Sequence, residues 1–253
     1  MSVKEKMTAI ADAIRDKTGE TSLLTLEDMA TDIQKVYETG KVDGARAWWD
    51  CMTKDNTVTN YNNRFCRCNF NRVTGGFHPP YTLKPQYAVD MFTYCQGVTK
   101  ITKEQIDFSN CLSYNYAFSN CSDLVEIEEI VLADNAYMFA ECKKLETIGR
   151  IIINGVKHFA GNPPFVNCGA LKNITFEGAI LNAVSFRWSP LLTANSIESI
   201  VSALSVDATG QTITFNTAAK ETYYNAHSSE YADADEAWDA LCDTKLNWTI
   251  SLV

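Results

Sequence analysis

The residues of this chain that could do metal or redox chemistry are nine cysteines and three histidines. A zinc site needs four ligands, usually from paired Cys or His at short spacing. The chain has no Cys-x-x-Cys pair, and Cys66-x-Cys68 has no second pair nearby. His78, His158 and His227 are scattered singly. The spacing therefore predicts no metal site, and no motif calls for a cofactor.

Nucleophilic catalysis is a second possibility, because a cysteine beside a histidine can attack a substrate. Cys66 and His78 could form such a pair, but the sequence shows no third group that would orient the histidine. We also find no Gly-x-Ser-x-Gly elbow, phosphate-binding glycine loop, His-Glu-x-x-His motif or dinucleotide fingerprint. We therefore predict that the protein is not an enzyme and assign no catalytic residue.

Most of the cysteines share a neighbour, since six of the nine have a phenylalanine three residues before them. Random placement would give about 0.4 such pairs, so the spacing needs a structural cause. The pairs are Phe65/Cys68, Phe92/Cys95, Phe108/Cys111, Phe118/Cys121, Phe139/Cys142 and Phe165/Cys168. This regularity indicates that the cysteines belong to a repeat.

Four of the pairs extend into a longer register, Phe-x-x-Cys-x-x-Leu-x-x-Ile, with valine replacing leucine in the first copy. The copies are Phe92/Cys95/Val98/Ile101, Phe118/Cys121/Leu124/Ile127, Phe139/Cys142/Leu145/Ile148 and Phe165/Cys168/Leu171/Ile174. They start 26, 21 and 26 residues apart, and a decayed copy with Phe186, Ser189 and Leu192 follows 21 residues later. Such a period is typical of a solenoid, in which each coil buries one face against the next. Phe108/Cys111 lies outside this register.

Each copy predicts the same local structure. Apolar residues at a period of three suit a tight turn that stacks Phe, Cys and Leu inward, and the β-branched runs that follow read as short strands. These runs are Ile130-Val131-Leu132, Ile151-Ile152-Ile153 and Ile174-Thr175-Phe176, with later candidates at Val184-Ser185-Phe186 and Ile213-Thr214-Phe215. Strands that recur once per copy should form a parallel β ladder. The predicted fold class is α+β, with a short solenoid over residues 91–192.

The cysteine of each copy is best explained as a small buried side chain with a weak S–H donor. A reactive thiol needs an accessible, electropositive setting, so the structural role outweighs a catalytic one. The decayed copy carries serine at this position, which fits the same role. The residues assigned to the structural repeat are Phe92, Cys95, Phe118, Cys121, Leu124, Phe139, Cys142, Leu145, Phe165, Cys168 and Leu171.

This repeat unit resembles the BspA-like leucine-rich repeat over about residues 87–192. The resemblance implies a solenoid whose stacked coils present an extended surface. It says little about the partner of that surface, which the residues do not identify.

The first 55 residues read as a helical leader. Ser2 with Glu5, and Thr25 with Asp28, are capping-box patterns ahead of apolar residues at helical spacing. Two readings remain open for this leader: a cap on the solenoid, or a module for attachment or oligomerisation. The leader resembles that of tail-associated structural proteins from prophages of Gram-positive gut bacteria. The resemblance lies in the run Ile10-Ala-Asp-Ala-Ile-Arg-Asp-Lys-Thr-Gly19 and in the later pair Trp48-Trp49. That resemblance implies docking to a phage tail, and a place in the virion.

Residues 56–90 carry arginines interleaved with aromatic residues, and Gly75-Gly76 and Pro79-Pro80 mark turns. We expect a hairpin or an irregular segment leading into the solenoid. Aromatic faces and guanidinium groups could bind a ligand such as a sugar or single-stranded nucleic acid. The alternative, which we favour, is that the aromatics begin the first coil. The candidate ligand-binding residues are Tyr61, Arg64, Arg67, Arg72, Phe77 and Tyr81.

The last part, residues 193–253, is acidic and reads as a C-terminal α/β cap of the solenoid. Asn195 with Glu198, and Asp233 with Glu236, are expected helix starts, and Trp248 to Val253 is an expected strand. The acidic cluster at 230–239 lacks the frame of an EF-hand loop, so a solvated helix start is the better reading.

Composition limits the partners. The formal charge of −9 disfavours nucleic acid, and no apolar run approaches a membrane span. No secretory signal is visible, so we expect cytoplasmic synthesis. We predict a non-enzymatic structural and recognition protein, tail-associated, that binds a protein or a glycan, with self-association or tail docking through the leader. The alternatives are a bacterial cell-surface interaction protein of the BspA-like type and a glycan-cleaving tail component, which needs two carboxylates across a groove.

Overall fold

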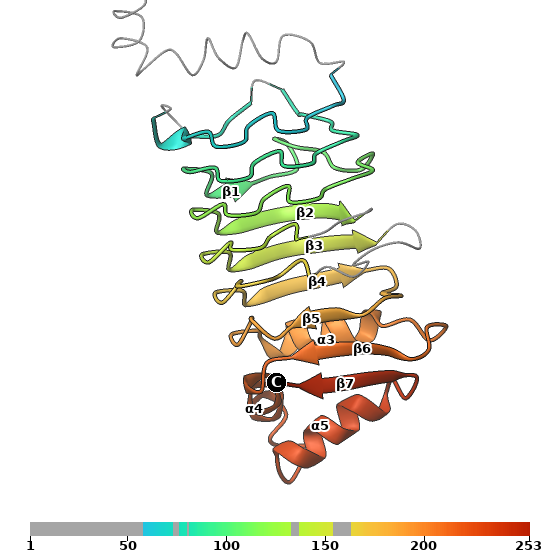
Figure 1. Ribbon diagram of the computed structural model, residues 1–253. Helices are drawn as coiled ribbons and strands as arrows, with labels where there is room; N and C mark the ends of the chain where they lie inside the picture. The colour runs from blue at the N-terminus through green and yellow to red at the C-terminus, as the bar shows by residue number, and fades with distance from the viewer. Residues whose placement is uncertain (1–57, 73–75, 80, 133–136, 154–162) are drawn as a thin grey trace, which may run out of the picture.

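The computed structural model describes residues 58–72, 76–79, 81–132, 137–153 and 163–253 (Figure 1). The predicted helical leader lies outside these residues. The described chain is of mixed α/β type, and its strands form two parallel sheets with three α-helices. No helix among the described residues has the length and apolar character needed to cross a membrane.

The first sheet has four strands in the order of the chain: β1 (Lys100–Ile101), β2 (Glu126–Leu132), β3 (Thr147–Ile153) and β4 (Asn173–Glu177). All neighbours are parallel, and the register pairs equivalent repeat positions, as in Ile127 with Ile148 and Ile148 with Ile174. The three predicted strands at 130–132, 151–153 and 174–176 are therefore confirmed. We call this side of the molecule the isoleucine wall.

The second sheet comprises β5 (Val184–Phe186), β6 (Gln211–Phe215) and β7 (Trp248–Leu252), again parallel. The strands predicted at 184–186 and 213–215 are present as β5 and β6, but the expectation that they extend the ladder of the first sheet is wrong. β5 carries the phenylalanine of its repeat copy, whereas β4 carries the isoleucine of the copy before it, so the two strands occupy different positions of the repeat. Figure 1 shows the arrows of β2 to β4 and of β5 to β7 pointing in opposite directions. The second sheet therefore extends the opposite side, which we call the phenylalanine wall.

A column of phenylalanine rings fills the interior. Successive rings from Phe65 to Phe215 are stacked, with centroids 4.9 to 5.9 Å apart. The column contains Phe65, Phe92, Phe118, Phe139, Phe165, Phe186 and Phe215, and Trp238 closes it edge-on at 5.7 Å. Stacked aromatic pairs add about 0.5–1.5 kcal/mol each beyond the area that they bury. The ring column is thus continuous through the predicted boundary at residues 192 and 193.

The cysteines form a second column beside the rings, and each thiol contacts the preceding unit. The Cys121 thiol donates to the Phe92 carbonyl at 2.9 Å, and the Cys168 thiol donates to that of Phe139 at 3.1 Å. Cys95 and Cys142 make the same bond to Phe65 and Phe118. In the decayed copy the Ser189 hydroxyl donates one unit back as well, to the Cys168 carbonyl. The repeat position therefore requires a small side chain with a donor.

Helix α3 (Ala194–Ala203) takes the place of a further strand on the isoleucine wall. The Ser196 hydroxyl accepts from the Ile174 N–H, and the Ser199 hydroxyl accepts from that of Phe176, which satisfies the edge of β4. A covered edge cannot pair with another chain. The helix begins at Ala194 with Thr193 as its N-cap, so the cap predicted at Asn195 is wrong by two residues. Thr193 satisfies the Ser196 N–H through its hydroxyl, which an N-cap must do.

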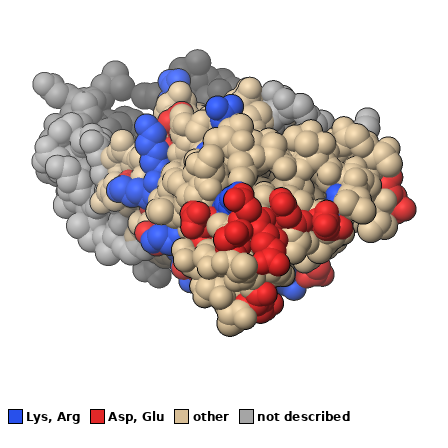
Figure 2. All heavy atoms as spheres, turned by 90° about the horizontal axis from the view of Figure 1, so that it is seen from below, with Lys and Arg blue, Asp and Glu red and all other residues tan. Residues whose placement is uncertain are grey.

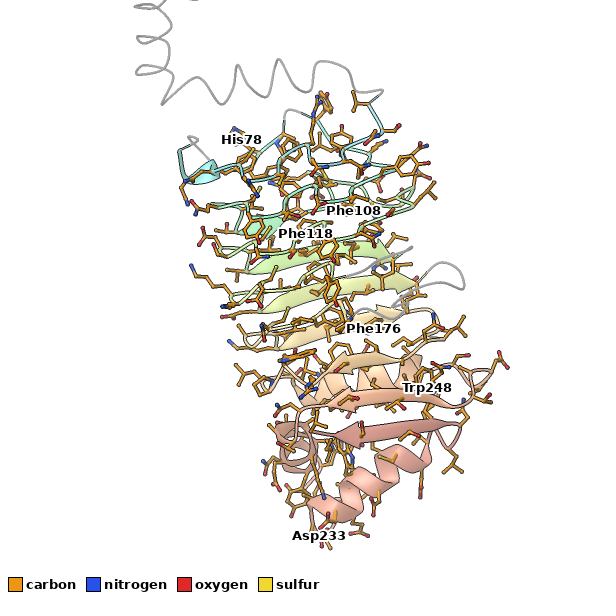
Figure 3. All side chains as sticks on the ribbon, in the orientation of Figure 1. His78, Phe108, Phe118, Phe176, Asp233 and Trp248 are labelled. Carbon is orange, nitrogen blue, oxygen red and sulfur yellow. The ribbon has the colours of Figure 1, made fainter. Side chains whose placement is uncertain are left out.

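The C-terminal end is formed by α4 (Ala218–Ala226), α5 (Ala234–Asp243) and β7. Asp233 caps α5 by accepting from the Asp235 and Glu236 N–H groups, as predicted. Helix α4 was not predicted. Figure 2, seen from this end, shows acidic side chains gathered on it, and Asp233 lies at its tip in Figure 3. Like charge on this end disfavours stacking against a second copy of it.

The described residues between 58 and 86 form a further repeat unit. Its bridges to the next unit are parallel, as between Asn60 and Tyr87 and between Asn69 and Gln96. The two strands of a hairpin pair antiparallel, and no antiparallel bridge is present among the described residues of this segment. Phe65 and Cys68 occupy the repeat positions, and the Phe65 ring begins the column. The favoured alternative, that the aromatics of this segment begin the first coil, is the one that the contacts support.

Phe108 and Cys111 lie in the longer connection between two units. The Phe108 ring meets the Phe118 ring edge-on at 6.0 Å, and both are labelled in Figure 3. The Cys111 thiol donates to the Ser113 carbonyl, 3.5 Å away and two residues on, rather than to a carbonyl of the preceding unit. This pair therefore fills the side of the core without joining the cysteine column.

Candidate ligand-binding surface

The predicted ligand-binding residues do not come together on one surface. Tyr61 and Phe77 are core residues, only 2% and 5% exposed. The Phe77 ring meets Phe65 edge-on at 5.8 Å and Phe92 at 5.0 Å. A ligand cannot reach these rings, so their assignment as binding residues is wrong. Their spacing reflects packing around the first ring of the column.

The remaining candidates are divided. Arg64 and Tyr81 are half-buried, and Tyr81 packs against the core. Arg72 ends a short 3-10 helix, η1 (Phe70–Arg72), and its side chain lies outside the described part. Arg67 is exposed, and its guanidinium lies 5.8 Å from the centre of the Tyr94 ring. Among the candidates whose side chains are described, Arg67 is the exposed one, and it lies over the ring of a residue in the next unit.

The phenylalanine wall has two outward positions per unit, two residues before and two residues after the phenylalanine. At these positions the backbone is left-handed, with φ between 49° and 65°. They are occupied by Asn63, Asp90, Tyr116 and Tyr137 before the ring, and by Arg67, Tyr94, Asn120, Glu141 and Asn167 after it. The residues between them, such as Ala117 and Ser119, are buried. Side chains at the left-handed positions therefore form the outer face of this wall.

Three of these positions hold tyrosine. Tyr94 and Tyr116 are 53% and 42% exposed, and Tyr137 is half-buried. The rings of Tyr116 and Tyr137 are stacked, with centroids 5.4 Å apart and planes 17° apart. We call Tyr94, Tyr116 and Tyr137 the tyrosine surface.

Polar groups accompany the tyrosine surface. The Thr93 hydroxyl is 2.9 Å from the Asp90 carboxylate and 2.6 Å from the Tyr116 carbonyl. The Asn167 amide donates to the Glu141 carboxylate, which lowers the pKa of Glu141. Glu141 is thus an ionised acceptor at neutral pH. Carboxylate and amide groups beside exposed rings can hydrogen-bond a ligand that has its own donors and acceptors.

The isoleucine wall differs, because its charged side chains are paired with one another. Glu129 accepts from Lys103 at 2.7 Å and from Arg150, and Arg150 also reaches Glu177 at 3.0 Å. The hydrogen bond from Lys103 holds the pKa of Glu129 below its usual range. A ligand here would have to displace these pairs.

Four of the thiols are poor nucleophiles at neutral pH, because a raised pKa leaves little of the reactive thiolate. Burial raises the pKa of Cys121 and of Cys168 well above the usual value, and raises that of Cys111 to about 11. Burial also raises the pKa of Cys66, and His78 contacts the Gly76 carbonyl at 2.9 Å. Within the described residues, no group of three or more His, Cys, Asp or Glu could hold a metal ion.

Sequence reasoning missed the tyrosine surface, although a signal was present. Tyr116 and Tyr137 each precede their phenylalanine by two residues, so the pattern is Tyr-x-Phe-x-x-Cys in two consecutive copies. Asparagine and aspartate at equivalent offsets favour left-handed turns. Together these features indicate an outward turn position that carries an aromatic ring.

Comparison of the chain with protein-family models, with curated proteins and with solved structures finds no match.

Proposed function

We propose that this protein is a non-enzymatic recognition protein, built as a short leucine-rich-repeat solenoid of the BspA-like type and associated with a prophage tail. The parallel strands, the unit-by-unit register and the continuous ring column support the solenoid. The resemblance of residues 1–55 to tail-associated leaders supports the location. Stacked coils commonly serve as extended binding surfaces.

The observation that carries the recognition role is the tyrosine surface. A left-handed backbone costs an ordinary residue roughly 1–2 kcal/mol, and asparagine or aspartate less. Asn63, Asn120 and Asn167 occupy equivalent positions, so the fold accepts asparagine there. Because Tyr94 and Tyr116 are exposed, packing of their side chains against the core offsets little of the cost of the left-handed backbone. Strain of this kind typically marks functional sites, where the residue is retained for what it contacts.

The tail location is tested in the bacterium whose genome carries the gene for this protein. Particles released after prophage induction are purified, and their proteins are identified by mass spectrometry. We expect this chain in intact tails, in a constant ratio to other tail proteins. Its absence from particles, together with recovery from the bacterial surface, would contradict the tail location and favour a cell-surface interaction protein.

Binding is tested separately. Fluorescently labelled full-length protein is incubated with intact Gram-positive cells, and a variant with Asn at positions 94, 116 and 137 serves as the comparison. We expect the wild type to bind saturably and the variant to lose most of this binding. Equal binding by both would remove the recognition role from the tyrosine surface.

A further inference from the structure

The chemistry of the tyrosine surface suggests one class of ligand, and the argument rests on the proposed recognition function. Tyr116 and Tyr137 lie in consecutive units, and their stacked side chains form a continuous aromatic strip from one unit to the next. Tyrosine provides rigid, amphipathic contact area at low entropic cost. A pyranose ring presents C–H groups on its face, which pack on the electron-rich face of an aromatic ring.

The other outward position of each of these two units is polar. Asn120 belongs to the unit of Tyr116, and Glu141 to the unit of Tyr137. Between the two outward positions the residues are small or buried, as with Ala117, Ser119 and Ala140. Planar amide and carboxylate groups can bind the hydroxyls at the edge of a sugar while the ring covers its face. An aliphatic protein hot spot would call for apolar neighbours at these positions instead.

Charge around the aromatic strip disfavours a polyanion. Glu141 is ionised and is accompanied by Lys143 at 3.3 Å, so this pair is neutral overall. Asp90 lies one unit before Tyr116, and Arg67 is engaged with the Tyr94 ring. Nucleic acids and strongly anionic polymers require an excess of basic side chains. A neutral chain of sugars suits this surface better.

We propose that the tyrosine surface binds a neutral glycan that lies along the stacked units, with sugar rings on Tyr116 and Tyr137 and hydroxyls bonded to Asn120 and Glu141. The equal offset of both tyrosines in consecutive units matches a ligand that is itself a repeating polymer. Each unit then contributes one aromatic side chain and one polar group.

The experiment measures binding of the full-length protein to purified Gram-positive cell walls in three preparations. One is untreated, one is digested with protease, and one is oxidised with periodate, which cleaves vicinal diols of sugars, and then washed. We expect unchanged binding after protease and loss of binding after periodate. In parallel, Tyr116→Asn/Tyr137→Asn should weaken binding by about tenfold or more, as expected for loss of two aromatic contacts.

Two control variants separate the ring contact from general effects. Tyr116→Phe/Tyr137→Phe keeps both rings and should stay within about threefold of wild type. Leu246→Ser removes a side chain that is 83% exposed at the C-terminal end and should bind like wild type. Circular dichroism and unfolding midpoints establish that each variant is folded.

The outcomes distinguish the two proposals. Loss of binding after protease with retention after periodate would overturn the glycan and leave a protein partner for the same recognition function. If Tyr116→Asn/Tyr137→Asn binds the cell walls as tightly as wild type does, the proposed site is wrong. Failure of the wild type to bind any wall preparation or intact cell would contradict the recognition function itself.

Discussion

The thiol of Cys142 donates a hydrogen bond to the carbonyl oxygen of Phe118, 24 residues earlier in the chain, at 2.9 Å. The same carbonyl accepts the N–H of Cys121, three residues after it, at 3.1 Å. One oxygen therefore closes the turn of its own unit and fixes the next unit upon it. This explains why phenylalanine and cysteine recur together at a spacing of three.

Substitution of Cys142 should reveal both requirements of its position. Cys142→Ser keeps a donor, as Ser189 does in the decayed copy. Cys142→Ala removes the donor and some volume, and should cost about 1–2 kcal/mol in the free energy of unfolding. Cys142→Val removes the donor and adds volume in a fully packed site, so we expect about 2 kcal/mol or more. Urea unfolding measures the series, and a valine variant as stable as wild type would contradict the role of the hydrogen bond.

Thiol reactivity should separate the cysteine column from the other thiols. Interaction with the Cys95 side chain lowers the pKa of Cys68, and Cys68 is half-buried. Burial raises the pKa of Cys121 and of Cys168. Because the thiolate is the reacting form, iodoacetamide should alkylate Cys68 first among the described cysteines. Peptide mass spectrometry follows each site, and rapid labelling of Cys121 without denaturant would contradict its placement.

The ring column should dominate stability. Phe139 is fully buried between Phe118 and Phe165, so Phe139→Ala should cost about 3–5 kcal/mol. Lys143→Ala, in the same unit, removes a side chain that is 72% exposed and should change stability by less than about 0.5 kcal/mol. Urea midpoints and slopes measure both. A small effect of Phe139→Ala would mean that the column is not the core.

Lys103, Glu129, Arg150 and Glu177 form a chain of ion pairs on the isoleucine wall, which we call the charge ladder. These pairs should make the free energy of unfolding depend on pH. The hydrogen bond from Lys103 lowers the pKa of Glu129 in the folded protein. The ionised Glu129 therefore contributes its full share to the free energy of unfolding above the unfolded pKa of about 4.3. It is lost as the pH falls through the folded pKa. Glu129→Gln should therefore lower the urea midpoint at pH 7, and this effect should shrink as the pH falls below about 4.

The matched control for this prediction is Glu177→Gln, at the exposed end of the same ladder, where the side chain is 57% exposed. Exposed ion pairs contribute little. Its midpoint at pH 7 should lie closer to wild type than that of Glu129→Gln. Equal effects of both substitutions would show that the ladder acts through general charge alone.

The tyrosine surface should trade stability for binding. Tyr116→Asn relieves the left-handed strain at φ 56° but loses the stacked contact with Tyr137. The two effects are each about 1 kcal/mol and oppose one another. We expect the free energy of unfolding to stay within about 1 kcal/mol of wild type or to rise. A loss of several kcal/mol would mean that Tyr116 belongs to the core.

Much of the fold could be predicted from the sequence, because the repeat encodes its own contacts. Phenylalanine and cysteine recur with the same offset in each copy, as in Phe118 and Cys121. Stacking of the copies follows from that offset. Strands at 130–132 and 151–153 follow from β-branched runs. The division into two sheets could not be predicted, because it depends on which repeat position each strand occupies, and a β-branched run does not specify that.

The site was harder to predict than the fold. Arginine and aromatic residues near Tyr61 and Phe77 suggested a surface, but at this repeat position the rings point inward. Composition does not distinguish a ring that starts a core column from a ring that faces solvent. Left-handed backbone at Tyr94 and Tyr116 is set by stacking of the units, and tyrosine itself gives no sign of it.

The most direct test of the account is a pair of measurements on one protein, Tyr116→Asn/Tyr137→Asn. Its affinity for protease-treated Gram-positive cell walls and its free energy of unfolding are compared with those of wild type. We predict that affinity falls by about tenfold or more while stability is unchanged or higher. Wild-type affinity in a folded variant would contradict the claim that these exposed tyrosines form the recognition surface.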